Sequence, residues 1–148
     1  HCLSSAASDV YKRQIKMIHG IGVDIVEVDR MRNIIIKHGD KFSRKILTPS
    51  EQLVYDKSTN KAQYMAKCWA VKEAFVKALG TGFSKDYSWS TIGYFTPTVS
   101  YGTSRPQVRL KQKLEGKTIH LSVSDEKRYV IAYVTIEETK NEQRSKLR

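Results

Sequence analysis

The longest mainly apolar stretch of the chain runs from Lys61 to Leu79, and its polar residues recur at helical spacing. At about 100° per residue, four of them fall within an arc of roughly 120°. These four are Gln63, Lys67, Glu73 and Lys77. The spacing predicts a helix over 61–79 that Thr59 or Asn60 caps and that Gly80 ends. Such a helix is central to a core, and its one polar stripe faces solvent or a site.

The residues before this helix predict one strand and two further helices. Residues 18–28 are rich in Ile and Val, which is typical of a strand. Asp29 then stands where a helix N-cap is expected, and Gly39 closes that helix. Thr48 is a plausible cap for a short helix with Pro49 at its first position.

After Gly82 the pattern changes to short segments of strand type. The expected strands are 91–95, 107–111, 118–124 and 129–137, with a turn over 124–127. Helices therefore gather in the first half and strands in the second. This segregation predicts an α+β fold with helices packed on an antiparallel sheet, and it argues against a doubly wound fold.

Composition favours a single globular domain. The chain has 148 residues, 40% hydrophobic and 28% charged. No apolar run approaches the roughly 18–20 residues of a membrane-spanning helix, so we expect no membrane partner. Residues 1–16 lack the apolar stretch of a signal peptide, and Met17 opens the first strand. We expect 1–16 to be a non-native or disordered leader, 17–137 to be the domain and 138–148 to be a charged tail; a native disordered arm is the alternative for 1–16.

The charge balance indicates an anionic partner. The net charge is +11, from 26 Lys and Arg against 15 Asp and Glu. Such a surface attracts nucleic acid, an acidic protein or a phosphate-rich small molecule. The two cysteines, Cys2 and Cys68, give no disulfide framework and no zinc spacing, which favours a reducing, cytoplasmic setting. Cys68 lies in the apolar helix and is expected in the core.

Asp24 lies inside the first apolar strand. A carboxylate taken out of water there needs a cation, a metal or several donors; otherwise it faces solvent near a strand end. The preceding Gly20 and Gly22 do not make a dinucleotide fingerprint, because Ile25 occupies the position of the third glycine. They are better explained by a close approach of backbone or ligand.

Glu73 and Lys77 stand four residues apart on the long helix. Their order favours an ion pair of about 0.2–0.5 kcal/mol, which is often only a solvated surface pair. The glycine-containing turn that follows, 80–82, gives a second interpretation: a lysine beside flexible backbone amides can hold phosphate. The histidines His19, His38 and His120 have no metal-ligand spacing.

Four segments resemble one known family. They are MIHGIGVDIVEV (17–28), FSRKILTPSE (42–51), WAVKEAFVKALGTG (69–82) and LSVSDEKRYVIAYV (121–134). In this order and spacing they are similar to the bacterial holo-[acyl-carrier-protein] synthases, the short trimeric type of the 4'-phosphopantetheinyl transferase superfamily. The resemblance covers the chain from Met17 to Glu137 and implies the fold of that superfamily.

The resemblance implies an activity. Members transfer the 4'-phosphopantetheine arm of coenzyme A to a serine of an acidic apo acyl carrier protein, in support of fatty acid biosynthesis. They release adenosine 3',5'-bisphosphate, depend on Mg2+ and are typically homotrimers with active sites at subunit interfaces. The base that accepts the serine proton stays open between a water on the metal and one of two carboxylates.

The resemblance also implies roles for particular residues. The metal ligands fall on Asp24 and Glu73, and a catalytic phosphate contact falls on Lys77. Coenzyme A contacts fall on Gly80, Thr81, Gly82, Arg105, Pro106 and, with less support, Asp125. Carrier contacts are expected from Arg30, with Lys41 and Lys45 nearby.

Three positions depart from the family pattern. Asp125 stands where many members have histidine, Ser104 replaces a glycine before Arg105-Pro106, and Lys45 replaces an arginine.

Two other functions are alternatives to the transferase. A basic nucleic-acid-binding module would use Tyr129 and Tyr133, but no RNA-binding motif is present and we expect no nucleic-acid partner. A carrier-binding protein that has lost catalysis is motivated by Asp125.

Overall fold

The computed structural model describes residues 14–98, 100–102 and 104–141. Within them the helices are α1 (Val28–His38), α2 (Asp40–Ile46), α3 (Pro49–Lys57) and α4 (Lys61–Leu79). The strands are β1 (Gln14–Glu27), β2 (Ile92–Phe95), β3 (Gln107–Leu110), β4 (Lys117–Asp125) and β5 (Tyr129–Asn141). The α+β class predicted from the sequence is confirmed.

The strands form two antiparallel sheets where one was expected. The larger has the order β1-β5-β4, and β2 pairs with β3 in the smaller. Strands β3 and β4 do not pair, because they are separated by an open pocket that side chains of both line. Hydrophobic patterns predict strands, but they do not say which edges meet.

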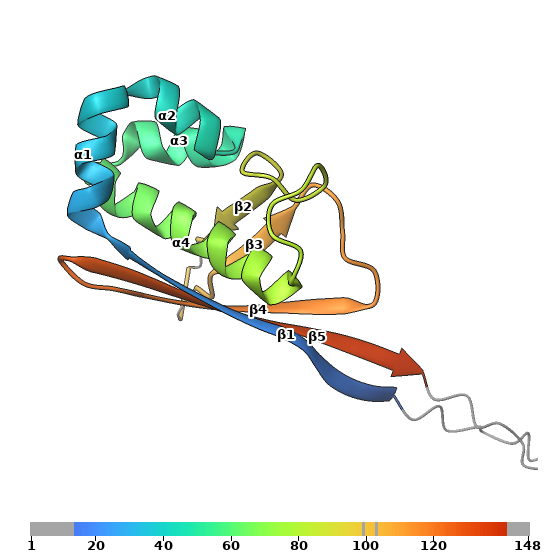
Figure 1. Cartoon of the computed structure of the whole chain (residues 1–148). Helices are drawn as coiled ribbons and strands as arrows, with labels where there is room; N and C mark the ends of the chain where they lie inside the picture. The colour runs from blue at the N-terminus through green and yellow to red at the C-terminus, as the bar shows by residue number, and fades with distance from the viewer. Residues whose placement is uncertain (1–13, 99, 103, 142–148) are drawn as a thin grey trace, which may run out of the picture.

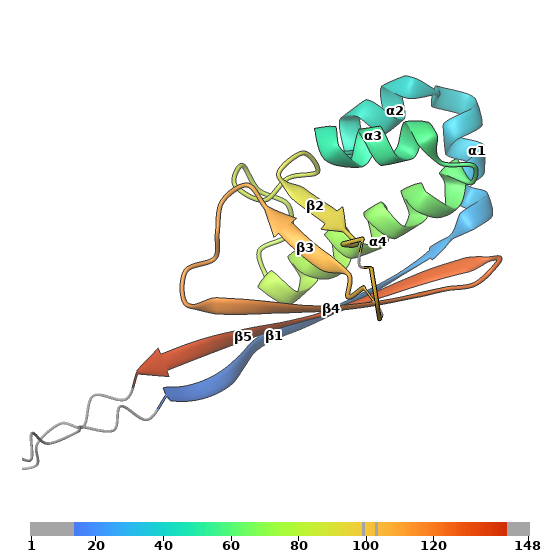
Figure 2. The ribbon, with the colours of Figure 1, turned by 180° about the vertical axis from the view of Figure 1, so that it is seen from behind.

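Helix α4 lies across one face of the three-stranded sheet, and α1, α2 and α3 gather on the other side of this helix (Figure 1). Seen from behind, β2 and β3 lie beside α4 and above β4 (Figure 2). The core is made by α4 together with the inner face of the sheet, including Val26, Val130 and Val134. This confirms that α4 is the central helix.

Two glycines allow β1 to approach α4. A Cβ atom on Gly20 would lie 1.9 Å from the carbonyl oxygen of Ala78, and one on Gly22 would lie 1.9 Å from that of Ala74. The predicted close approach is therefore confirmed, and the neighbour is the backbone of α4. It places Asp24, two residues after Gly22, against the same helix.

Helices α3 and α4 begin according to local capping rules. The side chain of Thr48 accepts a hydrogen bond from the Glu51 amide, and Glu51 accepts one from the Thr48 amide, which completes a capping box. Asn60 caps α4, and Gly80 ends it with a left-handed φ of 79°. These ends confirm the predicted limits of α3 and α4.

The prediction that Asp29 is an N-cap is wrong. Helix α1 begins at Val28 and its N-cap is Glu27, which makes no side-chain capping bond. The Val28 amide instead donates to the Arg128 carbonyl, so strand pairing continues directly into the helix. Asp29 lies in the first turn, where a carboxylate is favoured by the helix dipole and pairs with Arg32.

The sequence did not predict helix α2, which follows α1 with only Gly39 between them. Strands β1 and β5 also extend to Gln14 and Asn141, past the predicted domain limits. The assignment of a leader and a tail stays a prediction, and residues 1–13 and 142–148 lie outside the described residues.

Candidate functional site

Asp24 and Lys77 meet across the contact between β1 and α4. The Lys77 Nζ atom donates to Asp24 Oδ1 at 2.7 Å and to the Val23 carbonyl at 3.0 Å. The Asp24 side chain is only 16% exposed, whereas that of Lys77 is 50% exposed. Asp24 is thus a largely buried carboxylate with a cationic partner, and it is not a solvated strand end.

Glu73 lies one helical turn before Lys77, but the predicted Glu73–Lys77 ion pair does not form. Among the described residues the ion pair of Lys77 is with Asp24, because the two glycines bring β1 within reach of the lysine. Burial raises the pKa of Glu73, and the negative charge of Asp24 raises it further, while Lys77 acts in the opposite direction. Asp24 and Glu73 are therefore neighbouring carboxylates that repel one another.

The predicted phosphate-contacting turn directly follows this cluster. Gly80 and Gly82 have left-handed φ angles of 79° and 67°, and the three residues 80–82 are exposed. The Thr81 hydroxyl donates to the Gly82 carbonyl at 3.1 Å. The Gly80 amide is used to end α4, since it donates to the carbonyls of Val76 and Lys77. The backbone amides of this turn that a phosphate could reach are therefore those of Thr81 and Gly82.

The donor set around Asp24 suits a hard cation. Within the described residues, no three His, Cys, Asp or Glu side chains form a metal-binding group. The two carboxylates of Asp24 and Glu73 are enough for Mg2+, because this ion usually takes only one or two protein carboxylates and completes its coordination with substrate phosphate and water. A divalent cation would also relieve the repulsion that raises the pKa of Glu73.

Asp125 lies apart from this cluster, at the other edge of the sheet. Its carboxylate contacts two residues of α4: Lys67 Nζ at 3.0 Å and Gln63 Nε2 at 3.0 Å. Residues of the polar stripe predicted on α4 thus contact two different aspartates: Gln63 and Lys67 contact Asp125 on β4, and Lys77 contacts Asp24 on β1. The sequence placed these residues on one face of the helix but did not give their partners.

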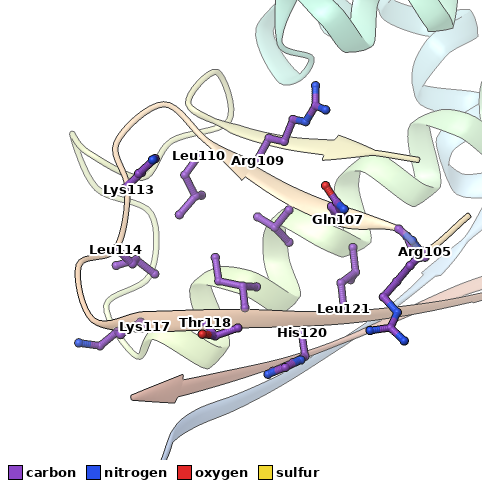
Figure 3. A pocket seen from close by; sticks show the side chains of 13 residues that line it. Arg105, Gln107, Arg109, Leu110, Lys113, Leu114, Lys117, Thr118, His120 and Leu121 are labelled. Carbon is purple, nitrogen blue, oxygen red and sulfur yellow. The ribbon is translucent and has the colours of Figure 1, made fainter. Parts of the chain in front are cut away.

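Arg105 and Pro106 lie in a different place again. They border an open pocket of about 840 Å³ between β3 and β4, into which Leu110, Leu114 and Leu121 project (Figure 3). Its basic side chains are those of Arg105, Arg109, Lys113, Lys117 and His120. The structure therefore does not bring Arg105 and Pro106 into one cavity with Lys77 or the 80–82 turn.

The predicted carrier contacts lie on the helical side of the molecule. Arg30 is an exposed residue of α1 and borders a shallow groove together with Asn33, Ile34 and Lys37. Lys41 and Lys45 are exposed on α2, the helix that the sequence did not predict.

A buried ion pair next to Glu73 was missed by the sequence reasoning. Lys72 and Glu51 are 0% and 1% exposed, with Nζ and Oε2 2.7 Å apart. The lysine also donates to the carbonyls of Ile46 and Trp89. The sequence did carry one signal for this pair, because Lys72 is a charged residue on the mainly apolar part of α4.

Cys68 is buried as predicted. Burial raises the pKa of its thiol, which excludes a reactive thiolate.

Comparison with known proteins shows the family of this chain. A family model described as the 4'-phosphopantetheinyl transferase superfamily matches residues 20–134, a range that includes Asp24, Glu73 and Lys77. The chain belongs to this superfamily. A holo-[acyl-carrier-protein] synthase of Dechloromonas aromatica is 40% identical over 123 residues, which cover 82% of this chain and 98% of the relative. One from Photobacterium profundum is 38% identical over 125 residues, covering 81% of this chain and 98% of the relative.

Solved structures of the superfamily share the fold. The holo-[acyl-carrier-protein] synthase of Neisseria meningitidis has a TM-score of 0.73 and 35% identity, covering 81% of this chain and 98% of its own. The Bacillus anthracis synthase, described in complex with coenzyme A (3',5'-ADP), has a TM-score of 0.69 and 32% identity. That match covers 82% of this chain and 98% of the other. The family resemblance stated from sequence motifs is thereby confirmed.

Proposed function

We propose that this chain transfers the 4'-phosphopantetheine moiety of coenzyme A to a serine of apo acyl carrier protein. The products are holo acyl carrier protein and adenosine 3',5'-bisphosphate, in support of fatty acid biosynthesis. The observation that carries the proposal is the meeting of Asp24, Glu73 and Lys77 between β1 and α4, beside the glycine turn. The relatives from Dechloromonas aromatica and Photobacterium profundum are holo-[acyl-carrier-protein] synthases, and this chain matches 98% of the length of each.

Asp24 and Glu73 are the residues that would hold Mg2+. Bound there, the ion would supply positive charge for the diphosphate of coenzyme A. The Lys77 ammonium group, half exposed and next to both carboxylates, would bind a phosphate oxygen and stabilise the charge that develops on the leaving group. The amides of Thr81 and Gly82 in the exposed turn would extend this anion-binding surface.

The transfer itself exchanges one P–O bond for another. The serine oxygen bonds to the phosphorus of the phosphopantetheine arm, and the bond from that phosphorus to adenosine 3',5'-bisphosphate breaks. The hydroxyl proton needs an acceptor. Asp24 already accepts a hydrogen bond from Lys77, whereas Glu73 forms no ion pair with Lys77, so Glu73 is the carboxylate better placed to accept the proton.

We further propose a homotrimer in which the sites are completed between subunits. The outer face of the three-stranded sheet exposes Ile21, Val23, Ile25, Ile131 and Tyr133. A contiguous apolar face of this kind supports an interface between copies of the chain. Within one chain, the pocket that Arg105 and Pro106 line does not include Lys77. In a trimer, Arg105 and Pro106 of one subunit would contact coenzyme A that is bound by Lys77 of another subunit.

The proposed protein partner is an acidic acyl carrier protein. The net charge of +11 favours rapid encounter with such a partner. Arg30, Lys41 and Lys45 are exposed on neighbouring helices and would contact it. In the described part of the chain, no helix has the length and apolar character to cross a membrane. We propose that the reaction takes place in the cytoplasm.

The nucleic-acid alternative gains no support from the surface that it would use. Tyr133 lies opposite Val23 on the exposed face of the sheet, and its neighbour Ile131 lies opposite Ile25. On its other side Tyr133 pairs with Ser122 of β4, so neither of its cross-strand partners is basic. The Arg128 guanidinium lies 5.4 Å from the ring centroid of Tyr129, which is one cation beside one ring and not a row of alternating aromatic and basic side chains.

Replacing Glu73 by Gln tests the proposed site. The amide keeps the shape of the side chain but removes a metal ligand and a proton acceptor, so transfer with Mg2+ should fall by at least about a hundredfold. Glu115→Gln, at an exposed turn position, is the matched control and should keep the wild-type rate. A near-normal rate for Glu73→Gln, with circular dichroism showing a folded protein, would overturn the assignment.

A further inference from the structure

A second lysine–aspartate contact joins α4 to the sheet. Asp125 is the last residue of β4 and pairs with Val130, whose side chain is buried, so the two lie on the face that α4 covers. There its carboxylate meets Lys67 and Gln63, both at 3.0 Å. The Gln63 amide also donates to the Glu126 carbonyl at 3.1 Å, so α4 contacts both the end of β4 and the turn that follows.

The contact is ionic. Burial alone would raise the pKa of Asp125, but hydrogen bonds from Lys67 and Gln63, together with the charge of Lys67, outweigh it and lower the pKa. The carboxylate therefore carries its charge at neutral pH and holds the lysine. The side chains are only partly exposed, 25% for Lys67 and 36% for Asp125.

The two lysine–aspartate contacts lie at opposite edges of the sheet. Asp24 is on β1 and Asp125 is on β4, with β5 between these strands. Their partners Lys77 and Lys67 are ten residues apart on α4, about 15 Å along the helix axis. Glu73 stands between the two lysines. Its position relative to Asp24 therefore depends on how α4 is held at both edges.

We propose that Lys67, Gln63 and Asp125 form a positioning clamp for α4. Asp125 acts through Lys67 and Gln63 to fix the helix on β4, which keeps Glu73 opposite Asp24. Asp125 is thus a positioning residue and not a direct coenzyme A contact. The inference rests on the proposed function, because it assigns the clamp to the Asp24–Glu73 site of that reaction.

A charge swap tests the clamp. Lys67→Asp and Asp125→Lys should each lower kcat by roughly three- to tenfold and raise the Mg2+ concentration for half-maximal rate by a similar factor. The KM for coenzyme A should stay within about twofold, since no substrate contact is lost. The double variant Lys67→Asp/Asp125→Lys restores the ion pair and should recover most of both losses.

A readout without turnover accompanies the kinetics. Mg2+ should raise the melting temperature of the wild type more than that of either single variant, and the double variant should regain the difference. Glu138→Gln is the matched control: it breaks an ion pair of similar exposure between β4 and β5, with Lys117 at 3.3 Å, which does not involve α4. This control should leave kcat and the Mg2+ response unchanged.

Each other outcome has a definite meaning. If Asp125→Asn raises the KM for coenzyme A while the charge swap rescues nothing, Asp125 contacts the substrate directly and the clamp is wrong. If the single variants change only the melting temperature and not the Mg2+ response, the contact is merely structural and the proposal fails. Absence of transfer by the wild type counts against the proposed function instead, and the melting measurements still test the clamp.

Discussion

Gly22 shows how one missing side chain determines the site. Replacing it by Ala would place a Cβ 1.9 Å from the Ala74 carbonyl oxygen and 2.5 Å from the Ala78 amide nitrogen, and neither backbone atom can move aside cheaply. We expect Gly22→Ala to lower the free energy of unfolding by about 1–3 kcal/mol or more. It should also reduce transfer, because Asp24 follows two residues later in the same strand. Urea denaturation and the transfer rate measure the two effects.

Gly93→Ala is the control for that substitution. A Cβ on Gly93 would meet its nearest atom at 3.5 Å, an ordinary contact distance, so stability should be nearly unchanged. Equal stability of Gly22→Ala and the wild type would mean that β1 and α4 are not held as closely as described.

At this scale the sequence indicated candidate residues but not the contacts that they make. For Asp24 in an apolar strand it left two interpretations open, a cationic partner or a solvated strand end, and the structure shows the first. Its partner Lys77 was instead assigned to Glu73, four residues away on the helix. Helical spacing gives neighbours within an element, but the contact that forms depends on the glycines of another element.

Among the helices, the buried Glu51–Lys72 pair connects several elements. Glu51 belongs to the capping box of α3 and accepts from the Tyr94 amide of β2, while Lys72 belongs to α4. Glu51→Gln would leave the buried Lys72 ammonium without its counter-charge. We expect the free energy of unfolding to fall by about 3–5 kcal/mol, measured by urea denaturation.

The double variant Glu51→Gln/Lys72→Met supplies the control. It removes the unpaired cation and should be more stable than Glu51→Gln alone. If Glu51→Gln unfolds at the same urea concentration as the wild type, the Glu51–Lys72 ion pair does not stabilise this part of the core.

Elements with strong local signals were predictable, and elements fixed by tertiary contacts were not. Thr48-Pro49 and Asn60 indicated where α3 and α4 begin, because caps and first-turn prolines are local chemistry. Helix α2 is seven residues long and follows a single glycine, which gives little periodicity to detect. The separation of β2–β3 from β4 depends on packing against α4, which no strand pattern records.

For the whole molecule, the exposed apolar sheet face predicts association. Val23 lies in this face and is 53% exposed. We expect the wild type to have three times the 17.0 kDa mass of one chain in light scattering, and Val23→Lys to shift it toward the monomer. Ile36→Lys, at an apolar position of α1 that is 77% exposed, is the control and should leave the assembly intact. A monomeric wild type would contradict the proposed trimer.

Basic charge and fold class could be predicted from composition and from the order of elements, whereas the position of the Arg105 pocket relative to Lys77 could not. Lys77 is in α4, whereas Arg105 lies in the segment between β2 and β3, and the two residues have different surroundings in space. Motifs identify the residues of a site one by one. Whether one chain or several complete it depends on surfaces that single motifs do not describe.

The central claim is tested most directly by the intact mass of an apo acyl carrier protein after incubation with this protein, coenzyme A and Mg2+. We predict a gain of one phosphopantetheine group, absent when EDTA is added. No gain from a folded protein, with a second carrier also tried, would contradict the transferase and favour a carrier-binding protein without catalysis.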